Sequence, residues 1–84
     1  MARGKTGNIS SKVFFSKNPL LKKIGQNVQY YREKKKETRD QFATNAELGK
    51  YFLYRIEFGN ANPSIMTLQK IADYLEIDLK KLLP

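Results

Sequence analysis

Apolar residues recur at intervals of three and four along most of this chain, which is the spacing of one face of an α-helix. The first such stripe follows Asn18 and Pro19. This pair suits a helix start because asparagine caps helices and proline is favoured at their first position. Three lysines at 34–36 then place cations at the negative end of the helix dipole. The pattern predicts a helix over residues 19–36, with a buried face formed by Leu21, Ile24, Val28 and Tyr31.

Residues 38–59 divide into two short helices joined by a tight turn. Thr38 and Gln41 have the spacing of a capping box, in which each side chain accepts the backbone amide of the other residue. Gly59 is expected to end the second helix in the left-handed conformation. The inward-facing positions of the two helices are Phe42, Ala43, Ala46, Leu53 and Ile56. Two short helices connected in this way form a helix-turn-helix.

A loop rich in turn-forming residues, 60–64, precedes two further predicted helices. Ser64 is expected to cap the longer one, and Asp78 is expected to cap a short last helix over residues 79–83. The inward stripe of the longer helix is Ile65, Leu68, Ile71, Ala72 and Leu75. The sequence has no strand pattern and no internal repeat. It therefore predicts an all-α fold of five helices over residues 18–84, preceded by a separate segment at 1–17.

Basic residues are concentrated in the first part of the chain, which carries a net charge of +8 overall. Residues 1–36 hold ten basic residues and one acid, whereas residues 37–84 hold six basic and seven acidic residues. Such an asymmetry indicates a polyanionic partner, either nucleic acid or an anionic membrane surface. Residues 1–17 are either a passive tail or a basic arm that follows the DNA backbone or enters a minor groove through Arg3 and Lys5.

Several function classes are disfavoured by composition. The chain has no histidine and no cysteine, so the usual general bases, nucleophiles and soft metal ligands are absent. We expect no enzymatic activity, no metal, no cofactor and no small-molecule substrate. No apolar run approaches the roughly 20 residues that span a bilayer, and no signal-peptide pattern opens the chain. We expect a cytoplasmic protein that acts without a membrane.

The exposed face of the second motif helix carries side chains that its core does not need. They are Lys50, Tyr51, Tyr54 and Arg55. Two tyrosines on such a face either pack on the loop at 60–63 or read base edges in a DNA major groove. Arg39, in the first turn of the preceding helix, is placed to contact a phosphate.

Residues 24–83 resemble the Xre/Cro-type helix-turn-helix repressors, without a gap over about 60 of the 84 residues. Each motif is weak alone, and their order and spacing carry the resemblance. The matching motifs are Ile24-Gly25-Gln26-Asn27-Val28 with Arg32, Phe42-Ala43 with Leu48, Arg55-Ile56-Glu57-Phe58-Gly59, and Asn62-Pro63-Ser64 with Leu68, Ile71-Ala72, Leu75 and Leu82-Leu83. The resemblance implies a lambda-repressor-like fold and a bacterial or phage context.

The resemblance also implies roles for individual residues. Arg32 and Glu57 would form a buried ion pair between the first helix and the recognition helix. Base contacts would come from Lys50, Tyr51 and Tyr54. Phosphate contacts would come from Thr38, Arg39, the backbone of Phe52, Arg55, Asn60 and Asn62.

Four positions depart from the family pattern. Arg39 replaces a common glutamine, and Phe52 stands where many members carry a tyrosine. Lys36 and Glu47 occupy positions where glycine is usual. A non-glycine residue at Glu47 is expected to need a positive φ, at a cost of roughly 1 kcal/mol or more.

The preferred function is sequence-specific binding of duplex DNA by a homodimeric transcription regulator. Two recognition helices would meet successive major grooves about 34 Å apart on a pseudo-palindromic operator. The dimer would form through an apolar C-terminal surface consisting of Tyr74, Ile77, Leu79, Leu82 and Leu83. A restriction–modification controller, a phage-type repressor and an antitoxin remain open as roles. The alternative classes are a helical protein-interaction module that no longer reads DNA, with Tyr51, Tyr54 and Phe58 as its patch, and a membrane-surface peptide.

Overall fold

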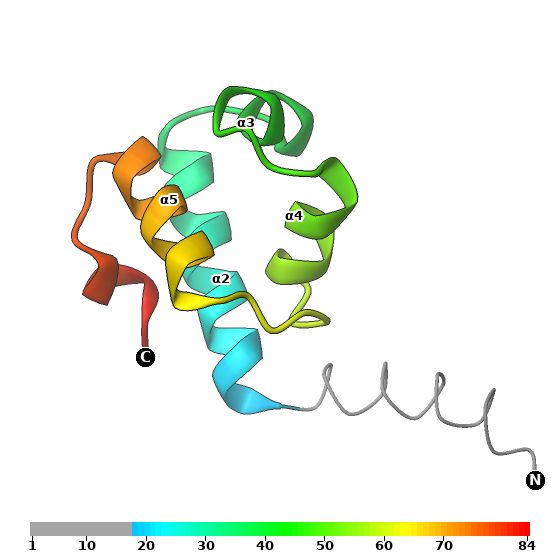
Figure 1. The fold of residues 1–84 in the computed structure, drawn as a ribbon, viewed down its shortest axis with the longest axis vertical. Coiled ribbons are helices and arrows are strands. Elements are labelled where there is room, and N and C mark those ends of the chain that lie inside the picture. Colours follow the sequence, from blue (N-terminus) through cyan, green and yellow to red (C-terminus); the bar gives the residue numbers. More distant parts are fainter. Residues whose placement is uncertain (1–17) are drawn as a thin grey trace, which may run out of the picture.

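The computed structural model describes residues 18–84, which form four α-helices and one 3-10 helix (Figure 1). The α-helices are α2 (Pro19–Lys34), α3 (Arg39–Asn45), α4 (Lys50–Glu57) and α5 (Ile65–Leu75), and the 3-10 helix is η1 (Leu79–Leu82). The described part of the chain contains no strand, so the all-α class is confirmed. The fifth predicted helix was wrong in type, because the residues after Asp78 form only a single 3-10 turn.

The starts of the α-helices follow the predicted capping chemistry. The side chain of Asn18 accepts from the amides of Leu20 and Leu21, and Ser64 accepts from the amide of Thr67. The capping box at the start of α3 is complete in both directions. The predicted cap at Asp78 is not formed, since its side chain makes no capping hydrogen bond. The single turn of η1 closes instead through the backbone, from the amide of Lys81 to the carbonyl of Asp78 at 2.9 Å.

All four α-helices end in the same way, with one residue in the left-handed conformation just past the last turn. The left-handed residues are Lys36 (φ 62°), Glu47 (φ 58°), Gly59 (φ 74°) and Glu76 (φ 59°). At each end two amides bond back to carbonyls of the last turn, as in a Schellman motif. The positive φ predicted at Glu47 is therefore confirmed. The one at Glu76 had no signal in the sequence.

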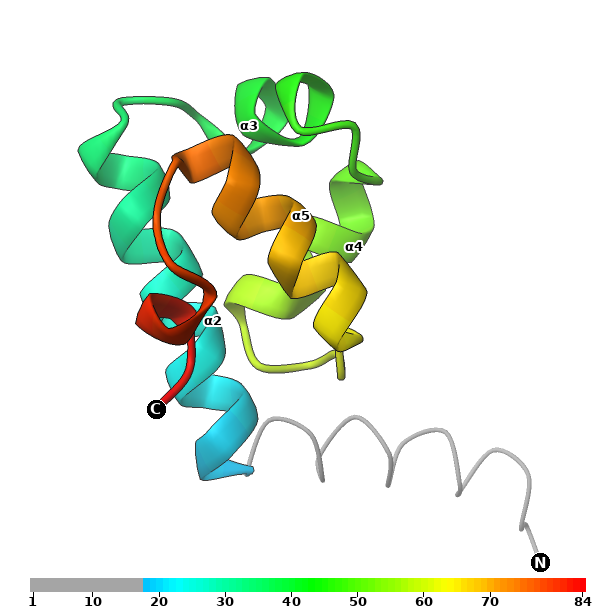
Figure 2. The ribbon, with the colours of Figure 1, turned by 60° about the vertical axis from the view of Figure 1, so that its left-hand side comes forward.

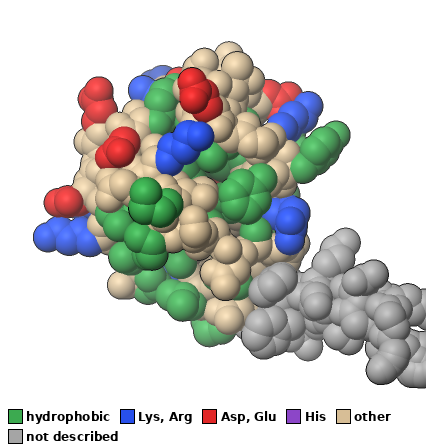
Figure 3. Space-filling view, in the orientation of Figure 1, with side chains coloured by type: hydrophobic (Ala, Val, Ile, Leu, Met, Phe, Trp, Pro, Cys, Tyr) green, Lys and Arg blue, Asp and Glu red, His purple; other side chains and the backbone are tan. Residues whose placement is uncertain are grey.

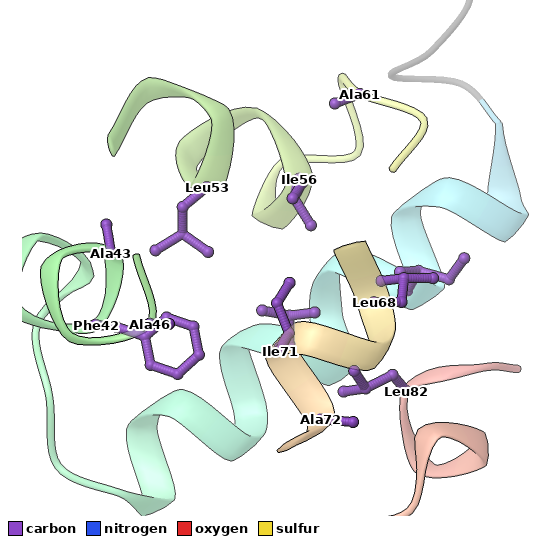
Figure 4. Close-up of a cluster of buried hydrophobic side chains, with 12 residues drawn as sticks. Phe42, Ala43, Ala46, Leu53, Ile56, Ala61, Leu68, Ile71, Ala72 and Leu82 are labelled. Atoms are coloured by element: carbon purple, nitrogen blue, oxygen red, sulfur yellow. The ribbon is translucent and has the colours of Figure 1, made fainter. Parts of the chain in front are cut away.

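The core is enclosed by α2 together with α3, α4, α5 and η1 (Figures 1 and 2). Leu53 and Ile56 of α4 point toward Phe42 of α3 and Ile71 of α5 (Figure 4). The fully buried large side chains are Val28, Phe42, Leu53, Ile56, Leu68, Ile71 and Leu82. Most residues of the predicted helix stripes are buried, and Tyr31 and Leu75 are half-buried. Ile65 is 58% exposed, because it is the first residue of α5 and lies at the edge of the core.

Gly25 allows α2 and α4 to approach closely. A Cβ atom at this position would collide with the backbone carbonyl of Ile56 and would lie 2.7 Å from the carbonyl oxygen of Glu57. Backbone atoms cannot move aside as a flexible side chain can. The end of α4 is therefore held directly against the middle of α2.

The face of the domain seen in Figure 3 carries acidic, basic and hydrophobic side chains interspersed with one another. Within residues 18–84, no helix combines the length and the apolar character that a membrane span requires.

Candidate nucleic-acid interface

The start of α4 presents long side chains to solvent. Tyr51 is 73% exposed, and the side chain of Lys50 is about half exposed. The ring of Tyr51 meets the ring of Tyr54 edge to face, with the centroids 5.9 Å apart, and the Lys50 ammonium lies 5.8 Å from the Tyr51 centroid. Gly49 caps α4 without a side chain, so the first amides of the helix lack a side-chain acceptor. This end of α4 is open to hydrogen-bond acceptors.

Tyr54 is fixed by α3. Its hydroxyl donates to Oδ1 of Asp40 at 2.9 Å, and Nζ of Lys50 lies 3.5 Å from Oδ2 of the same residue. The hydrogen bond to Asp40 is the main cause of a raised pKa for Tyr54, followed by burial of the hydroxyl. The hydroxyl thus goes to α3, whereas one sequence interpretation directed the tyrosines to the loop at 60–63. Asp40 was not predicted from the sequence, where its only signal is an acid in the first turn of α3.

Arg32 and Glu57 form the ion pair that the family resemblance implied. Nε and Nη2 of Arg32 donate to the two carboxylate oxygens at 2.7 and 3.1 Å. Arg32 also donates to the carbonyl of Glu37 at 2.8 Å, which ties the end of α2 to the following turn. The carboxylate of Glu57 is fully buried, and the side chain of Arg32 is 7% exposed. This pair fixes α4 to α2.

Arg39 binds the same carboxylate, a contact that was not predicted from the sequence. Its Nε donates to Oε1 of Glu57 at 2.7 Å, and its guanidinium lies over the rings of Tyr54 and Phe58 at 5.8 and 5.0 Å from their centroids. The side chain is 30% exposed. Arg39 was predicted to contact a phosphate. In the structure its Nε already donates to Glu57. A phosphate contact would use its terminal amino groups.

Thr38 and Phe52 are two further predicted phosphate ligands. Thr38 is exposed, and its Oγ1 accepts the amide of Gln41, which leaves the hydroxyl proton free to donate. The side chain of Phe52 is half-buried against the core, so only its backbone can serve. Thr38 and Arg39 also line a hollow at the start of α3 together with Arg32, Glu33, Asp40 and Tyr54.

The loop after α4 is tied to that helix through Arg55 and Asn60. Nη2 of Arg55 donates to the Asn60 carbonyl at 3.1 Å, and the Asn60 amide donates to the Arg55 carbonyl at 2.7 Å. Arg55 and Asn62 are exposed. Oδ1 of Asn60 is buried and has no hydrogen-bond partner among the described residues. The structure therefore brings Arg55 and Asn60 together beside the end of α4.

The predicted dimer surface is only partly available. Leu82 is fully buried inside the monomer, where it packs in the core, so its assignment to an interface was wrong. Tyr74 is half-buried, donates its hydroxyl to Glu37 at 2.7 Å and meets the ring of Phe42 edge to face. Ile77, Leu79 and Leu83 are half-buried at the surface. Ile77 lines a shallow hollow with Tyr31, Lys34, Lys35 and Leu75.

Two predictions concern other parts of the chain or other chemistry. Arg3 and Lys5 of the predicted arm lie outside the described residues. Within residues 18–84, no group of three or more acidic residues is placed to hold a metal ion.

These elements coincide with those of a known family. A family model described as a helix-turn-helix domain matches residues 25–84, which is most of the chain. The chain belongs to the helix-turn-helix domain family. Relatives of this helix-turn-helix protein place it in the Xre-like class and confirm the all-α fold.

Three relatives illustrate the similarity. The HTH-type transcriptional regulator SlrR of Bacillus subtilis is 35% identical over 60 residues, which cover 70% of this chain and 40% of SlrR. The crystal structure of the restriction-modification controller protein C.AhdI from Aeromonas hydrophila superposes with a TM-score of 0.71 at 27% identity, over 75% of this chain and 96% of that chain. The crystal structure of SinR, the master regulator for biofilm formation, in complex with DNA superposes with a TM-score of 0.67 at 33% identity, over 70% and 95% of the two chains.

The helix-turn-helix protein thus spans 40% of the length of SlrR but nearly the whole of the C.AhdI and SinR chains.

Proposed function

We propose that this chain is a DNA-binding transcription regulator that reads a specific duplex sequence with α4. The observation that carries the proposal is the start of α4, where Lys50 and Tyr51 are exposed beside unpaired helix amides. A recognition helix presents its N-terminal side chains to base edges in the major groove. The similarity to SinR, whose structure was solved with DNA, supports the same use of this helix.

The proposed division of labour follows the geometry of the surface. Lys50, Tyr51 and Tyr54 contact bases. The phosphates on either side are bound by Thr38, Arg39, the Phe52 amide, Arg55, Asn60 and Asn62. Phosphate contacts fix the register of the helix, and base contacts carry the sequence information.

We further propose that the regulator binds as a homodimer through Ile77, Leu79 and Leu83, with Tyr74 at the edge of that surface. These residues are half-buried in the monomer, and a domain of this size has a small core of its own. Two copies would bring two α4 helices to successive major grooves of a pseudo-palindromic operator.

The proposed role is that of a repressor or of a restriction–modification controller. The similarity to C.AhdI along nearly its whole length supports the controller role. A phage repressor or an antitoxin is the second candidate within the same mechanism. We propose a cytoplasmic protein that acts on DNA. The proposal includes no catalysis and no bound cofactor.

A protein-interaction module is the second candidate from a different class, and it is favoured by the exposure of Tyr51 (73%) and Phe58 (54%). The two candidates differ in their response to salt. DNA binding weakens with a log–log slope of about −0.9 for each phosphate neutralised, whereas an aromatic protein patch has no such dependence.

The deciding experiment selects an operator from a random duplex library and then compares Tyr51→Ala and Lys50→Ala with the unmodified chain. Each substitution should cost about 1–3 kcal/mol of operator affinity and relax the preference at one base position. Met66→Ala is the matched control, because Met66 is equally exposed (77%) but lies at the start of α5.

Circular dichroism should show that all three variants remain folded. Equal losses on operator and random DNA would mean that Tyr51 and Lys50 touch only the backbone. No enrichment of any duplex, or binding that ignores salt, would refute DNA reading altogether.

A further inference from the structure

Asp40 lies on the surface that the proposed function turns toward DNA, although its charge has the same sign as that of DNA. It occupies the first turn of α3, and its side chain is 59% exposed. An acid near a helix N-terminus stabilises the helix dipole, but an exposed carboxylate also repels nearby phosphates. Its position therefore calls for a reason connected with binding.

Both carboxylate oxygens of Asp40 are engaged by α4. Oδ1 accepts the Tyr54 hydroxyl at 2.9 Å, and Oδ2 lies 3.5 Å from Nζ of Lys50. The Tyr54 ring in turn supports Tyr51, at 5.9 Å between centroids. One carboxylate thus orients all three side chains that are proposed to contact bases.

We propose that Asp40 is a specificity-determining residue, which holds Lys50 and Tyr54 in the geometry that reads the operator and lowers the affinity for all other DNA. This inference rests on the proposed function and names the residue that sets its selectivity.

The effect on Lys50 is electrostatic. A lysine ammonium is a flexible point charge that neutralises phosphates of any sequence. Held by Asp40, Lys50 gives up an ion pair before it binds a phosphate, so random DNA gains less from it. Exposed ion pairs of this kind are worth about a two- to fivefold change in an equilibrium constant.

The effect on Tyr54 is a choice of hydrogen-bonding role. A tyrosine hydroxyl can both donate and accept. Because Tyr54 donates its proton to Asp40, its oxygen offers only lone pairs to DNA. A lone pair in the major groove pairs with the amino group of adenine or cytosine and not with the acceptors of guanine or thymine. Without Asp40 the hydroxyl can also donate, and this preference disappears.

The test replaces Asp40 by alanine in the full chain, with Asp73→Ala as the matched control. Asp73 is an exposed acid on α5 that accepts a hydrogen bond from Gln69 at 2.7 Å, so its loss removes the same charge at a place away from α4. The dissociation constants for the selected operator and for a random duplex of equal length are measured over a series of salt concentrations.

In Asp40→Ala, the ratio of operator affinity to random affinity should fall by about two- to fivefold. Random binding should tighten and its salt slope should steepen by about 0.9, since Lys50 becomes free to neutralise one more phosphate. In Asp73→Ala the ratio should stay unchanged.

A second variant, Tyr54→Phe, keeps the ring and removes the hydroxyl. If Asp40 acts partly through that hydroxyl, the effects of Asp40→Ala and Tyr54→Phe on the ratio should be less than additive in the double variant. The pKa of Tyr54, followed by NMR of its ring carbons, should fall toward its ordinary value in Asp40→Ala, because the Asp40 hydrogen bond is the main cause of its elevation.

An unchanged ratio in a folded Asp40→Ala protein overturns the proposal, since a role in the stability of α3 alone lowers binding to both duplexes equally. Strictly additive effects in the double variant overturn the part that concerns Tyr54. Failure of the unmodified chain to bind any duplex would instead refute the proposed function, and the two failures are therefore distinguishable.

Discussion

At the scale of single residues, the carboxylate of Glu57 holds two guanidinium groups at once. Arg32 reaches it from α2 and Arg39 from α3, each with an Nε to oxygen distance of 2.7 Å. The carboxylate has no exposed surface, so its charge is compensated entirely by these partners. Removing one charge from such a cluster costs more than removing the whole cluster, because the remaining charges are left buried without a partner.

We therefore expect Glu57→Gln to lower the free energy of unfolding by about 3–5 kcal/mol. An amide oxygen cannot neutralise the Arg32 guanidinium, whose side chain is only 7% exposed. For a domain of this length, such a loss lowers the melting temperature by more than about 10 °C.

Glu33→Gln is the matched control for that measurement. Glu33 is 3.8 Å from the same Arg32, but its side chain is 60% exposed, so its loss should cost less than about 1 kcal/mol. Calorimetry that finds equal melting temperatures for the two variants would contradict the proposed weight of the Glu57 cluster.

The sequence allowed part of this site to be predicted. Arg32 and Glu57 were paired through the family resemblance, because their positions match the family motif. The third member could not be found in that way, because Arg39 departs from the family residue at its position. Asp40 was also missed, since a long-range contact between a first-turn acid and a tyrosine fourteen positions later leaves no periodic signal.

At the scale of elements, the four α-helices end with the same backbone conformation but with different residues. Each α-helix stops at a left-handed residue, but only Gly59 of the four is a glycine. An L-residue pays about 1–2 kcal/mol for this conformation. The Lys36 and Glu47 positions could be suspected from the sequence because the family places glycine there. Glu76 could not, since neither a glycine nor the family resemblance marks this position.

Glycine at Lys36, Glu47 or Glu76 should therefore stabilise the domain. The relief of strain exceeds the entropy that glycine adds to the unfolded chain, so each substitution should raise the unfolding free energy by about 0.5–1 kcal/mol. Denaturant titrations of the three single variants measure this directly.

Gly59→Ala provides the opposite case in the same experiment. It places a side chain at φ 74°, with Cβ 2.9 Å from Cγ and 3.1 Å from Cα of Lys22. It should be destabilising. If Glu47→Gly lowers the free energy of unfolding, the Glu47 side chain makes a contact that outweighs the strain of its positive φ.

At the scale of the whole molecule, positive charge and the proposed reading surface belong to different parts of the chain. Residues 1–17 hold four basic residues and no acid, residues 18–84 have a net charge of +4, and residues 37–84 have a net charge of −1. Half of the net charge of +8 therefore lies in the segment before the domain. A basic arm would add to the general attraction for DNA without altering the sequence that α4 reads.

Removal of residues 1–17 should then weaken operator and random binding alike. It should also flatten the salt slope by about 0.9 for each phosphate that the arm neutralises in the full chain. Asn18, the cap of α2, is retained in this truncation. A full-length variant with glutamine at Arg3, Lys5, Lys12 and Lys17 separates the effect of charge from the effect of length. A salt slope that is identical in all three proteins would make the segment a passive tail.

Assembly is also a property of the whole molecule. Ile77→Lys and Leu79→Lys should shift the protein toward monomer in analytical ultracentrifugation, because each puts a charge into the proposed apolar interface. Both should also reduce operator binding by more than random binding, since the second half-site no longer gains from linkage to the first.

Met66→Lys makes the same chemical change on exposed α5 surface and should leave the assembly unchanged.

The fold class and the core stripes of α2, α3 and α4 could be predicted from periodicity, whereas the interface could not. Leu82 shows the reason. An apolar position in a periodic pattern can be buried in the core of one chain or in an interface between two copies, and the pattern does not distinguish them. An unmodified chain that stays monomeric at operator-saturating concentrations would refute the dimer.

The shared carboxylate of Glu57 has a further consequence for how this protein fails. Because this carboxylate ties the last residue of α4 to α2 and α3, we expect that α4 does not detach while the rest of the domain stays folded. Molecules in which α4 has detached are then expected to be unfolded throughout, and unfolded chains are open to proteolysis. No folded copies with a detached α4 would then remain to compete with intact chains as subunits of the proposed dimer.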